Sequence, residues 1–113
     1  HAELLKPKFN IVLEALEANL GELRIAEWTR PNGGYFVSVD VTPGLATKVI
    51  ELARDVGLSL TPAGATFPYG NDPLDRNVRI APTFADLEEL SESMQVLTLC
   101  IKLATAQSLV GNI

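Results

Sequence analysis

Apolar residues recur at helical spacing near both ends of the chain. Phe9, Leu13, Leu16 and Leu20 fall on one helical stripe with Val12 beside it, and Gly21 follows as a C-terminal stop. A second stripe with three-four spacing predicts a long final helix: Leu87, Leu90, Met94, Leu97, Ile101 and Ala104. The pattern Thr83-x-x-Asp86 resembles a capping box and is predicted to begin it. Because this helix has a second apolar side (Val96, Leu99, Cys100 and Leu103), we expect it to be buried or covered by a neighbour.

Between these helices the pattern changes to strict alternation. Tyr35, Val37, Val39 and Val41 share one face of a predicted strand, and Phe36, Ser38 and Asp40 share the other. Such a half-buried strand is typical of an antiparallel sheet. Shorter strands are predicted at an edge, from Arg24 to Thr29, and at Leu58 to Leu60 and Asn77 to Ala81.

A further helix is predicted between the strands. Thr42-Pro43 has the form of an N-cap followed by an N1 proline. Ala46, Val49, Ile50 and Ala53 would face inward, and Gly57 would end the helix. The resulting order, α-β-β-α-β-β-α, predicts an α+β fold (an α/β sandwich) with helices packed on a small mixed, largely antiparallel sheet. We expect residues 1–113 to form a single domain.

Composition excludes several classes of function. An apolar content of 47% is enough for a packed core in 113 residues. A net charge of −5 and the lack of a Lys/Arg cluster argue against nucleic-acid binding. No stretch of about 18 apolar residues is present, so no membrane span is expected. The single cysteine, Cys100, fits a reducing cytoplasm and is interpreted as a small core residue rather than a nucleophile.

Few residues offer chemistry of their own. His1 is the only histidine, so neither a Cys/His metal cluster nor a Ser-His-Asp triad can be built. Asn71, Asp72 and Asp75 lack the ligand spacing and closing Glu of a calcium loop, and we predict solvated turn residues. Arg79 can pair with a carboxylate through two parallel hydrogen bonds, although an ordinary solvated strand arginine is the commoner outcome of this pattern.

Two motifs and the loop between them carry a family resemblance. The motifs are Pro-Asn-Gly-Gly-Tyr-Phe at 31–36 and Asn-Val-Arg-Ile-Ala-Pro at 77–82, and the Pro/Gly-rich loop runs from Thr61 to Gly70. This ordered set resembles the C-terminal small domain of pyridoxal-phosphate-dependent aminotransferases of fold type I, and within them a bacterial aspartate aminotransferase subgroup. The resemblance extends from about Lys6 to about Leu109.

The resemblance implies a substrate-binding role for the segment. It assigns Arg79 to the α-carboxylate of an amino acid that is converted into a 2-oxo acid. Gly33, Gly34, Tyr35 and Phe67 are further candidates for the substrate site. The family's cofactor, pyridoxal 5'-phosphate, is bound mainly by a large domain that this chain lacks, and none of Lys6, Lys8, Lys48 and Lys102 lies in a cofactor-linking motif. We therefore expect no catalytic residue in this chain, no activity from it alone, and a cytoplasmic homodimeric parent enzyme.

Two other interpretations remain open. The same domain could be the effector-binding part of an aminotransferase-like transcriptional regulator, which an upstream DNA-binding segment would decide. Alternatively, it could be a free-standing module that binds a small carboxylate. The high apolar content counts against the free-standing module, because a surface normally covered by another domain explains it more simply.

Overall fold

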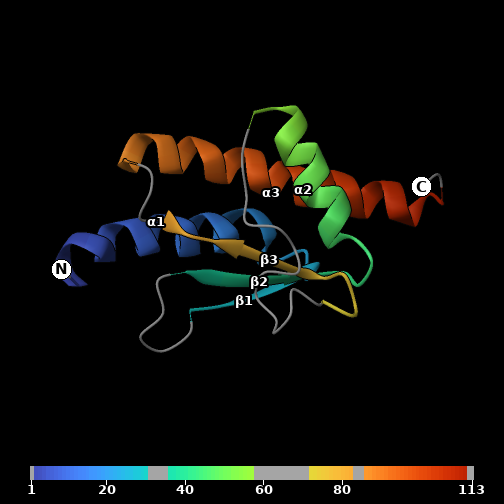
Figure 1. Ribbon diagram of the computed structural model, residues 1–113, viewed down its shortest axis with the longest axis horizontal. Helices are drawn as coiled ribbons and strands as arrows, with labels where there is room; N and C mark the ends of the chain where they lie inside the picture. Colours follow the sequence, from blue (N-terminus) through green and yellow to red (C-terminus); the bar gives the residue numbers. More distant parts are fainter. Residues whose placement is uncertain (1, 31–35, 58–71, 83–85, 112–113) are drawn as a thin grey trace.

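The computed structural model describes residues 2–30, 36–57, 72–82 and 86–111. Its elements follow the order α1 (Ala2–Leu20), β1 (Ala26–Thr29), β2 (Val37–Val41), α2 (Ala46–Asp55), β3 (Asn77–Ile80) and α3 (Leu87–Leu109). Figure 1 shows the three helices on one side of the strands, which confirms the predicted α+β class. The strand predicted at 58–60 lies outside the described residues.

The sheet has the order β1-β2-β3, and both pairings are antiparallel. Val37 is opposite Ile80 and Val39 is opposite Val78, so these valines and the isoleucine share one face. All of them are buried, as is Val41. The alternation predicted for the central strand is confirmed from Phe36 to Val41.

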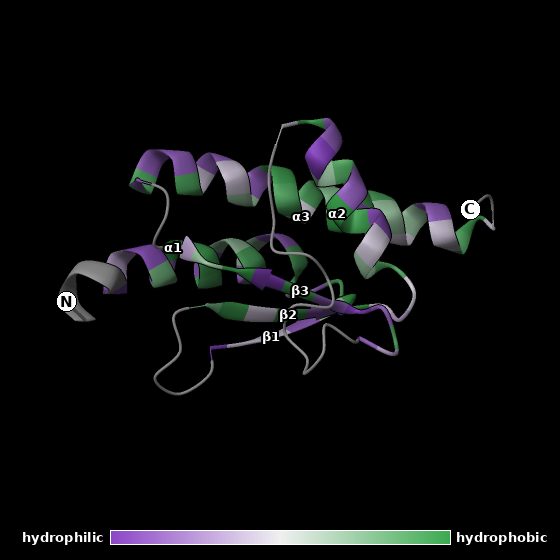
Figure 2. Ribbon diagram, in the orientation of Figure 1, coloured by the Kyte–Doolittle hydropathy of each residue, from purple (hydrophilic) through white to green (hydrophobic). Residues whose placement is uncertain are grey.

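A single hydrophobic core fills the space between this face and the helices. It contains residues from every helix and from β2 and β3, with Trp28 of β1 packed against it. The helical members with at most 1% exposure are Phe9, Val12, Leu16, Leu20, Ala46, Val49, Ala53, Met94, Leu97, Ile101 and Ala104. Figure 2 shows hydrophobic positions gathered where α2 crosses α3. Burial of these side chains supplies most of the driving force for the fold.

The two long helices pack against each other as their stripes predict, with exceptions at α3. Leu87, predicted to face inward, is 47% exposed because it is the first residue of the helix. On the second apolar side of α3, Cys100 is buried, whereas Leu99 and Leu103 are exposed in this chain. None of the helices among the described residues is long and apolar enough to cross a membrane.

The predicted start of α2 is wrong. The helix begins at Ala46 with Leu45 in the N-cap position, and the preceding turn contains Gly44 in the left-handed region, at φ +92°. Thr42 therefore lies too early to cap the helix. The capping acceptor comes from a distant segment instead: a carboxylate oxygen of Asp75 accepts hydrogen bonds from the backbone N–H and the hydroxyl of Thr47, at 3.0 and 2.7 Å.

The predicted capping box of the last helix is also shifted. The N-cap of α3 is Asp86, whose carboxylate accepts a hydrogen bond from the backbone N–H of Glu89 at 2.8 Å. Thr83 lies outside the described residues. Asp86 and Glu89 have the same i, i+3 spacing as the predicted pair. The sequence therefore predicted the correct type of cap but placed it three residues too early.

Candidate functional site

Polar side chains gather on the face of the sheet that points away from the helices, which we call the outer face. Its members are Ser38 and Asp40 of β2, Asn77 and Arg79 of β3, and Phe36, which immediately precedes β2. Ser38 is opposite Arg79 and Asp40 is opposite Asn77 in the strand register. No described helix lies over this face (Figure 1). The polar and charged side chains of the sheet therefore lie on the outer face, on the opposite side of the sheet from the apolar core.

Arg79 lies where the sequence predicts it. It is half-buried on β3, between the buried Val78 and Ile80, so its side chain leaves on the outer face. The guanidinium carbon lies 4.3 Å from the ring centroid of Phe36, a cation–π contact. Such a contact contributes about 0.5–1 kcal/mol and fixes the plane of the guanidinium. The arginine is thus orientated by an aromatic ring of the neighbouring strand.

Asn77 links the two strands through its side-chain amide. Its Nδ2 donates to the hydroxyl oxygen of Ser38 and to a carboxylate oxygen of Asp40, both at 2.8 Å. Asn77 is 3% exposed, and its Oδ1 has no hydrogen-bond partner among the described residues. The sequence motif drew attention to Asn77 but gave it no role. The signal that could have found the network is the alternation of Ser38 and Asp40 on the same face of β2.

A tight turn sets the position of β3. A carboxylate oxygen of Asp72 accepts from the backbone N–H groups of Arg76 and Asn77, at 3.0 and 2.8 Å. Asp75, at φ +47°, accepts from Thr47 at the start of α2. Asp72 and Asp75 lie in a partly exposed turn, as predicted, and both carboxylates also accept hydrogen bonds from backbone N–H groups. Among the described residues no group of His, Cys, Asp and Glu could hold a metal ion.

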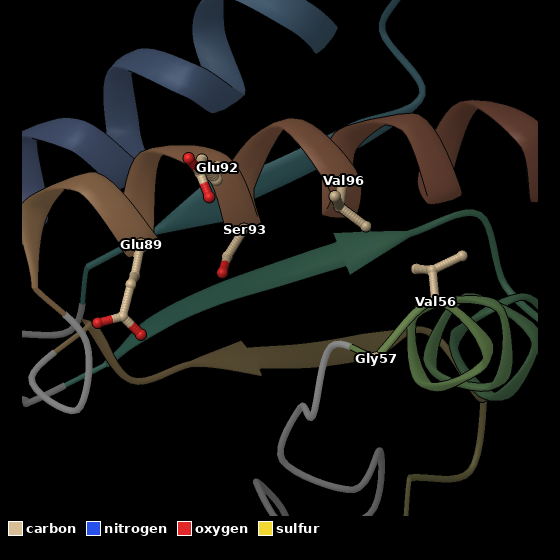
Figure 3. A pocket seen from close by; sticks show the side chains of 6 residues that line it. All are labelled: Val56, Gly57, Glu89, Glu92, Ser93 and Val96. Atoms are coloured by element: carbon tan, nitrogen blue, oxygen red, sulfur yellow. The ribbon is translucent and has the colours of Figure 1, made fainter.

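A separate pocket lies away from this face. It has a volume of about 270 Å³ and is lined by Val56 and Gly57, after α2, and by Glu89, Glu92, Ser93 and Val96 of α3. Figure 3 shows Val56 and Val96 pointing toward one another at one end, with Glu89 at the other. Its ionisable side chains are both acidic, so it does not fit an anionic substrate or a phosphate group.

Other predicted site residues cannot be placed. Gly33, Gly34, Tyr35 and Phe67 lie outside the described residues. Cys100 is buried on α3, and burial raises the pKa of its thiol, which agrees with the predicted core role. Of the candidates for substrate binding, the structure thus describes Arg79 alone.

The lysines of the described residues do not fit the role of a cofactor-linking lysine. Lys6 is exposed, and Lys8, Lys48 and Lys102 are half-buried on three different helices. None lines the described pocket, and none belongs to the outer face. We therefore derive no step through pyridoxal phosphate from this chain.

Comparison with known proteins decides the family. The aspartate amino-transferase family matches residues 1–113. The chain belongs to this aminotransferase family. An aspartate aminotransferase of Corynebacterium glutamicum is 48% identical over 107 residues, which is 95% of this chain and 25% of that protein. The crystal structure of an aspartate transaminase from the same organism superposes with a TM-score of 0.91 at 47% identity, covering 96% of this chain and 26% of the other.

More distant relatives extend the comparison. The structure of an α-aminoadipate aminotransferase from Thermus thermophilus, complexed with N-(5'-phosphopyridoxyl)-L-leucine, superposes with a TM-score of 0.73 at 26% identity, covering 88% of this chain and 25% of that one. An uncharacterised HTH-type transcriptional regulator, YdfD, of Bacillus subtilis is 31% identical over 103 residues, 87% of this chain and 19% of that protein. The chain spans about a quarter of the length of the aminotransferases that it matches.

Proposed function

We propose that this chain is the substrate-clamping small domain of a pyridoxal-phosphate-dependent aminotransferase, and that Arg79 binds the α-carboxylate of the substrate. The observation that carries the proposal is the placement of Arg79: a half-buried guanidinium, held over Phe36, on the polar outer face of a domain of this family. The 48% identical relative is an aspartate aminotransferase, which favours aspartate as the amino acid.

The geometry suits recognition of a carboxylate. Arginine offers a planar pair of N–H donors that matches the two oxygens of a carboxylate. A half-buried position lowers the effective dielectric constant, so the ion pair is stronger there than on an exposed surface. Closure of this domain over the substrate would exclude water and fix the orientation of the α-carbon. The role of this domain is therefore binding and orientation.

The remaining parts of the reaction would come from outside this segment. When bound, pyridoxal phosphate supplies an electron sink for the bond changes at the α-carbon. We assign the cofactor and its linking lysine to a large domain, and the second half of the site to a second subunit. Exposed apolar residues such as Val56, Leu99 and Leu103 support a surface that another part of the protein covers. The cytoplasm is the proposed compartment.

The test is substitution of Arg79 in the full-length protein. Arg79→Lys keeps the charge and loses the two-pronged geometry, so kcat/KM for L-aspartate should fall by roughly tenfold to a few hundredfold, the value of a hydrogen bond to a charged group. Arg79→Ala should cost more, because the carboxylate then enters without a counter-charge. The absorption spectrum of the bound cofactor should be unchanged in both variants.

Arg30 provides a matched control. Its guanidinium carbon also lies over an aromatic ring, at 3.7 Å from the centroid of Phe9, but Arg30 is exposed and lies at the end of β1. Arg30→Lys should leave kcat/KM unchanged. An Arg79→Ala enzyme with wild-type kcat/KM would show that the clamp is assigned to the wrong residue.

A second candidate is the effector domain of a transcriptional regulator, and the match to YdfD favours it. In that case Arg79 would bind a carboxylate effector without any turnover. A DNA-binding segment upstream, together with an effector-dependent change in DNA affinity that Arg79→Ala abolishes, would distinguish this function from transamination. The lower identity of that relative, 31% against 48%, places it second.

A further inference from the structure

The side of α3 that faces away from the core is apolar. Leu99 and Leu103 are 64% and 44% exposed, and Ala106 and Val110 are exposed further along the same side. Together with the half-buried Val96 they recur every three or four residues, which is the spacing of one helical stripe. We call these five residues the α3 stripe.

The α3 stripe has almost no charge around it. After Glu92, Lys102 is the single charged side chain of the helix. A solvated helix face normally carries charged residues, whereas a helix that is apolar on two sides is covered by a neighbour. Because Leu99 and Leu103 remain exposed in this chain, that neighbour is a further part of the parent protein or another molecule.

The cofactor-bearing domain is poorly placed to be this neighbour. Under the proposed function, on which this step rests, that domain lies against the outer face, because the substrate bridges Arg79 and the cofactor. The α3 stripe is on the other side of the molecule: the core lies between the sheet and the helices, and Leu97 and Ile101 are the side chains of α3 that face it (Figure 1). A domain seated on the outer face therefore leaves the α3 stripe uncovered.

We propose that the α3 stripe is an interface between two copies of this chain, in which α3 packs antiparallel against α3 of the second copy about a two-fold axis. Such an interface has to be self-complementary, because the same surface is used by both copies. An uncharged apolar stripe meets this condition. With the axis between Leu99 and Leu103, Leu99 of one copy faces Leu103 of the other, and Val96 faces Ala106.

The charges of α3 fit an antiparallel pair. The acidic residues at the N-terminal end of the helix are Asp86, Glu88, Glu89 and Glu92. In a parallel pair the two acidic ends would lie side by side and repel each other. In the antiparallel pair, Glu92 of one copy lies beside Val110 of the other. The helix between these positions is about 27 Å long at 1.5 Å per residue, well beyond the Debye length of about 8 Å at physiological salt.

The test is the mass of the full-length protein in solution, measured by sedimentation velocity. Leu103→Glu places a carboxylate opposite Leu99 at two symmetric positions. The Kd of association should rise at least roughly hundredfold, since two buried leucines are lost, and the mass should fall to half of the wild-type value. Adding Leu99→Lys places an ammonium group opposite each new carboxylate and should restore the wild-type mass at low ionic strength. Leu99→Lys alone should dissociate as Leu103→Glu does.

Leu23→Glu is the matched control, because Leu23 is 52% exposed and lies outside α3. Its mass should equal that of the wild type. A monomeric wild type, or a Leu103→Glu variant with the wild-type mass, would overturn the inference. A lowered Tm at unchanged mass would show that the same chain covers the α3 stripe, which also overturns it.

The rescue tests the direction of the pair. A double variant that stays dissociated would refute the antiparallel arrangement. Ala106→Glu, at an exposed position of the same stripe, carries the test if Leu103→Glu does not fold. Arg79→Lys should keep the wild-type mass whatever happens to its kcat/KM, so the substrate clamp and the α3 interface can fail separately.

Discussion

The two faces of the sheet are built from alternate residues of the same strands, yet they differ in almost every property. On the inner face, Val37, Val39, Val78 and Ile80 are at most 6% exposed and belong to the hydrophobic core. On the outer face, polar and charged side chains bond across the strands, and Arg79 is directed away from the core. Neighbouring residues of a strand point in opposite directions. Substitutions within the four residues of β3 are therefore expected to change either the stability of the fold or the binding of a ligand, depending on the face.

The largest effect is expected at Ile80, the inner-face neighbour of Arg79. Ile80→Ala removes a buried side chain from the inner face and should lower the free energy of unfolding by about 2–5 kcal/mol. Urea denaturation of the full-length protein measures it. At 25 °C, where the variant remains folded, KM for the amino acid should stay near the wild-type value, the reverse of the result expected for Arg79→Lys.

Thr29→Ala is the control for this prediction, since Thr29 is exposed and lies opposite Ser38 at the sheet edge. Its effect on the free energy of unfolding should stay within about 0.5 kcal/mol. If Ile80→Ala raised KM as strongly as Arg79→Lys does, the two faces would be coupled and the comparison would fail.

A smaller loss of stability is expected at the turn that precedes β3 and contacts the start of α2. Asp75 lies before β3 and caps α2, so Asp75→Ala removes two hydrogen bonds to Thr47 and places alanine at φ +47°. We expect a loss of about 1–2 kcal/mol in the free energy of unfolding, the usual value for a lost cap. Thermal and urea unfolding measure this loss.

Asp75→Asn is the matched variant. Asparagine tolerates the left-handed region and keeps one acceptor oxygen, so its cost should be well below that of alanine. Equal losses for the two variants would mean that the negative charge of Asp75, and not the geometry of its hydrogen bonds, stabilises the turn.

The sequence was informative wherever a pattern is local. Alternation from Phe36 to Val41 and around Arg79 identified both faces of the sheet, because side-chain direction in a strand depends only on position. The caps of α2 and α3 were misplaced. The α2 cap is supplied by Asp75, 28 residues beyond Thr47, and no local pattern encodes such a partner.

Alternation placed Ser38 and Asp40 on one face, but it could not show that they pair with Asn77, for a related reason. Asn77 bonds with Ser38 and Asp40, which are 39 and 37 residues away, and their meeting depends on the register between β2 and β3. A one-residue shift of that register would place Arg79 opposite a valine and put Asn77 beside different partners. The role of Arg79 still depends on the family resemblance, since alternation alone places an arginine without giving it a ligand.

The smallest expected effect concerns Asp86, the exposed N-cap of α3. The backbone N–H of Glu89 donates to the carboxylate of Asp86 and, with the adjacent Glu89 side chain, lowers the pKa of Asp86. A lowered pKa in the folded state means that ionised Asp86 stabilises the fold above the unfolded pKa of about 3.9. That contribution is lost as the pH falls through the lower folded value.

Asp86→Asn keeps an acceptor oxygen and removes the titration, so the difference in Tm between wild type and variant should shrink as the pH falls from 7 to below about 4. Glu89 acts in the opposite sense, because its hydrogen bond with Asp86 and the charge of Asp86 raise its pKa. The comparison is therefore repeated in a Glu89→Gln background, where the backbone donor remains and the opposing titration is absent. A Tm difference that stays constant with pH in that background would show that the Asp86 carboxylate does not stabilise α3 by its charge. Since Asp86 is exposed and is not a member of the outer face, KM at neutral pH should be unaffected in either case.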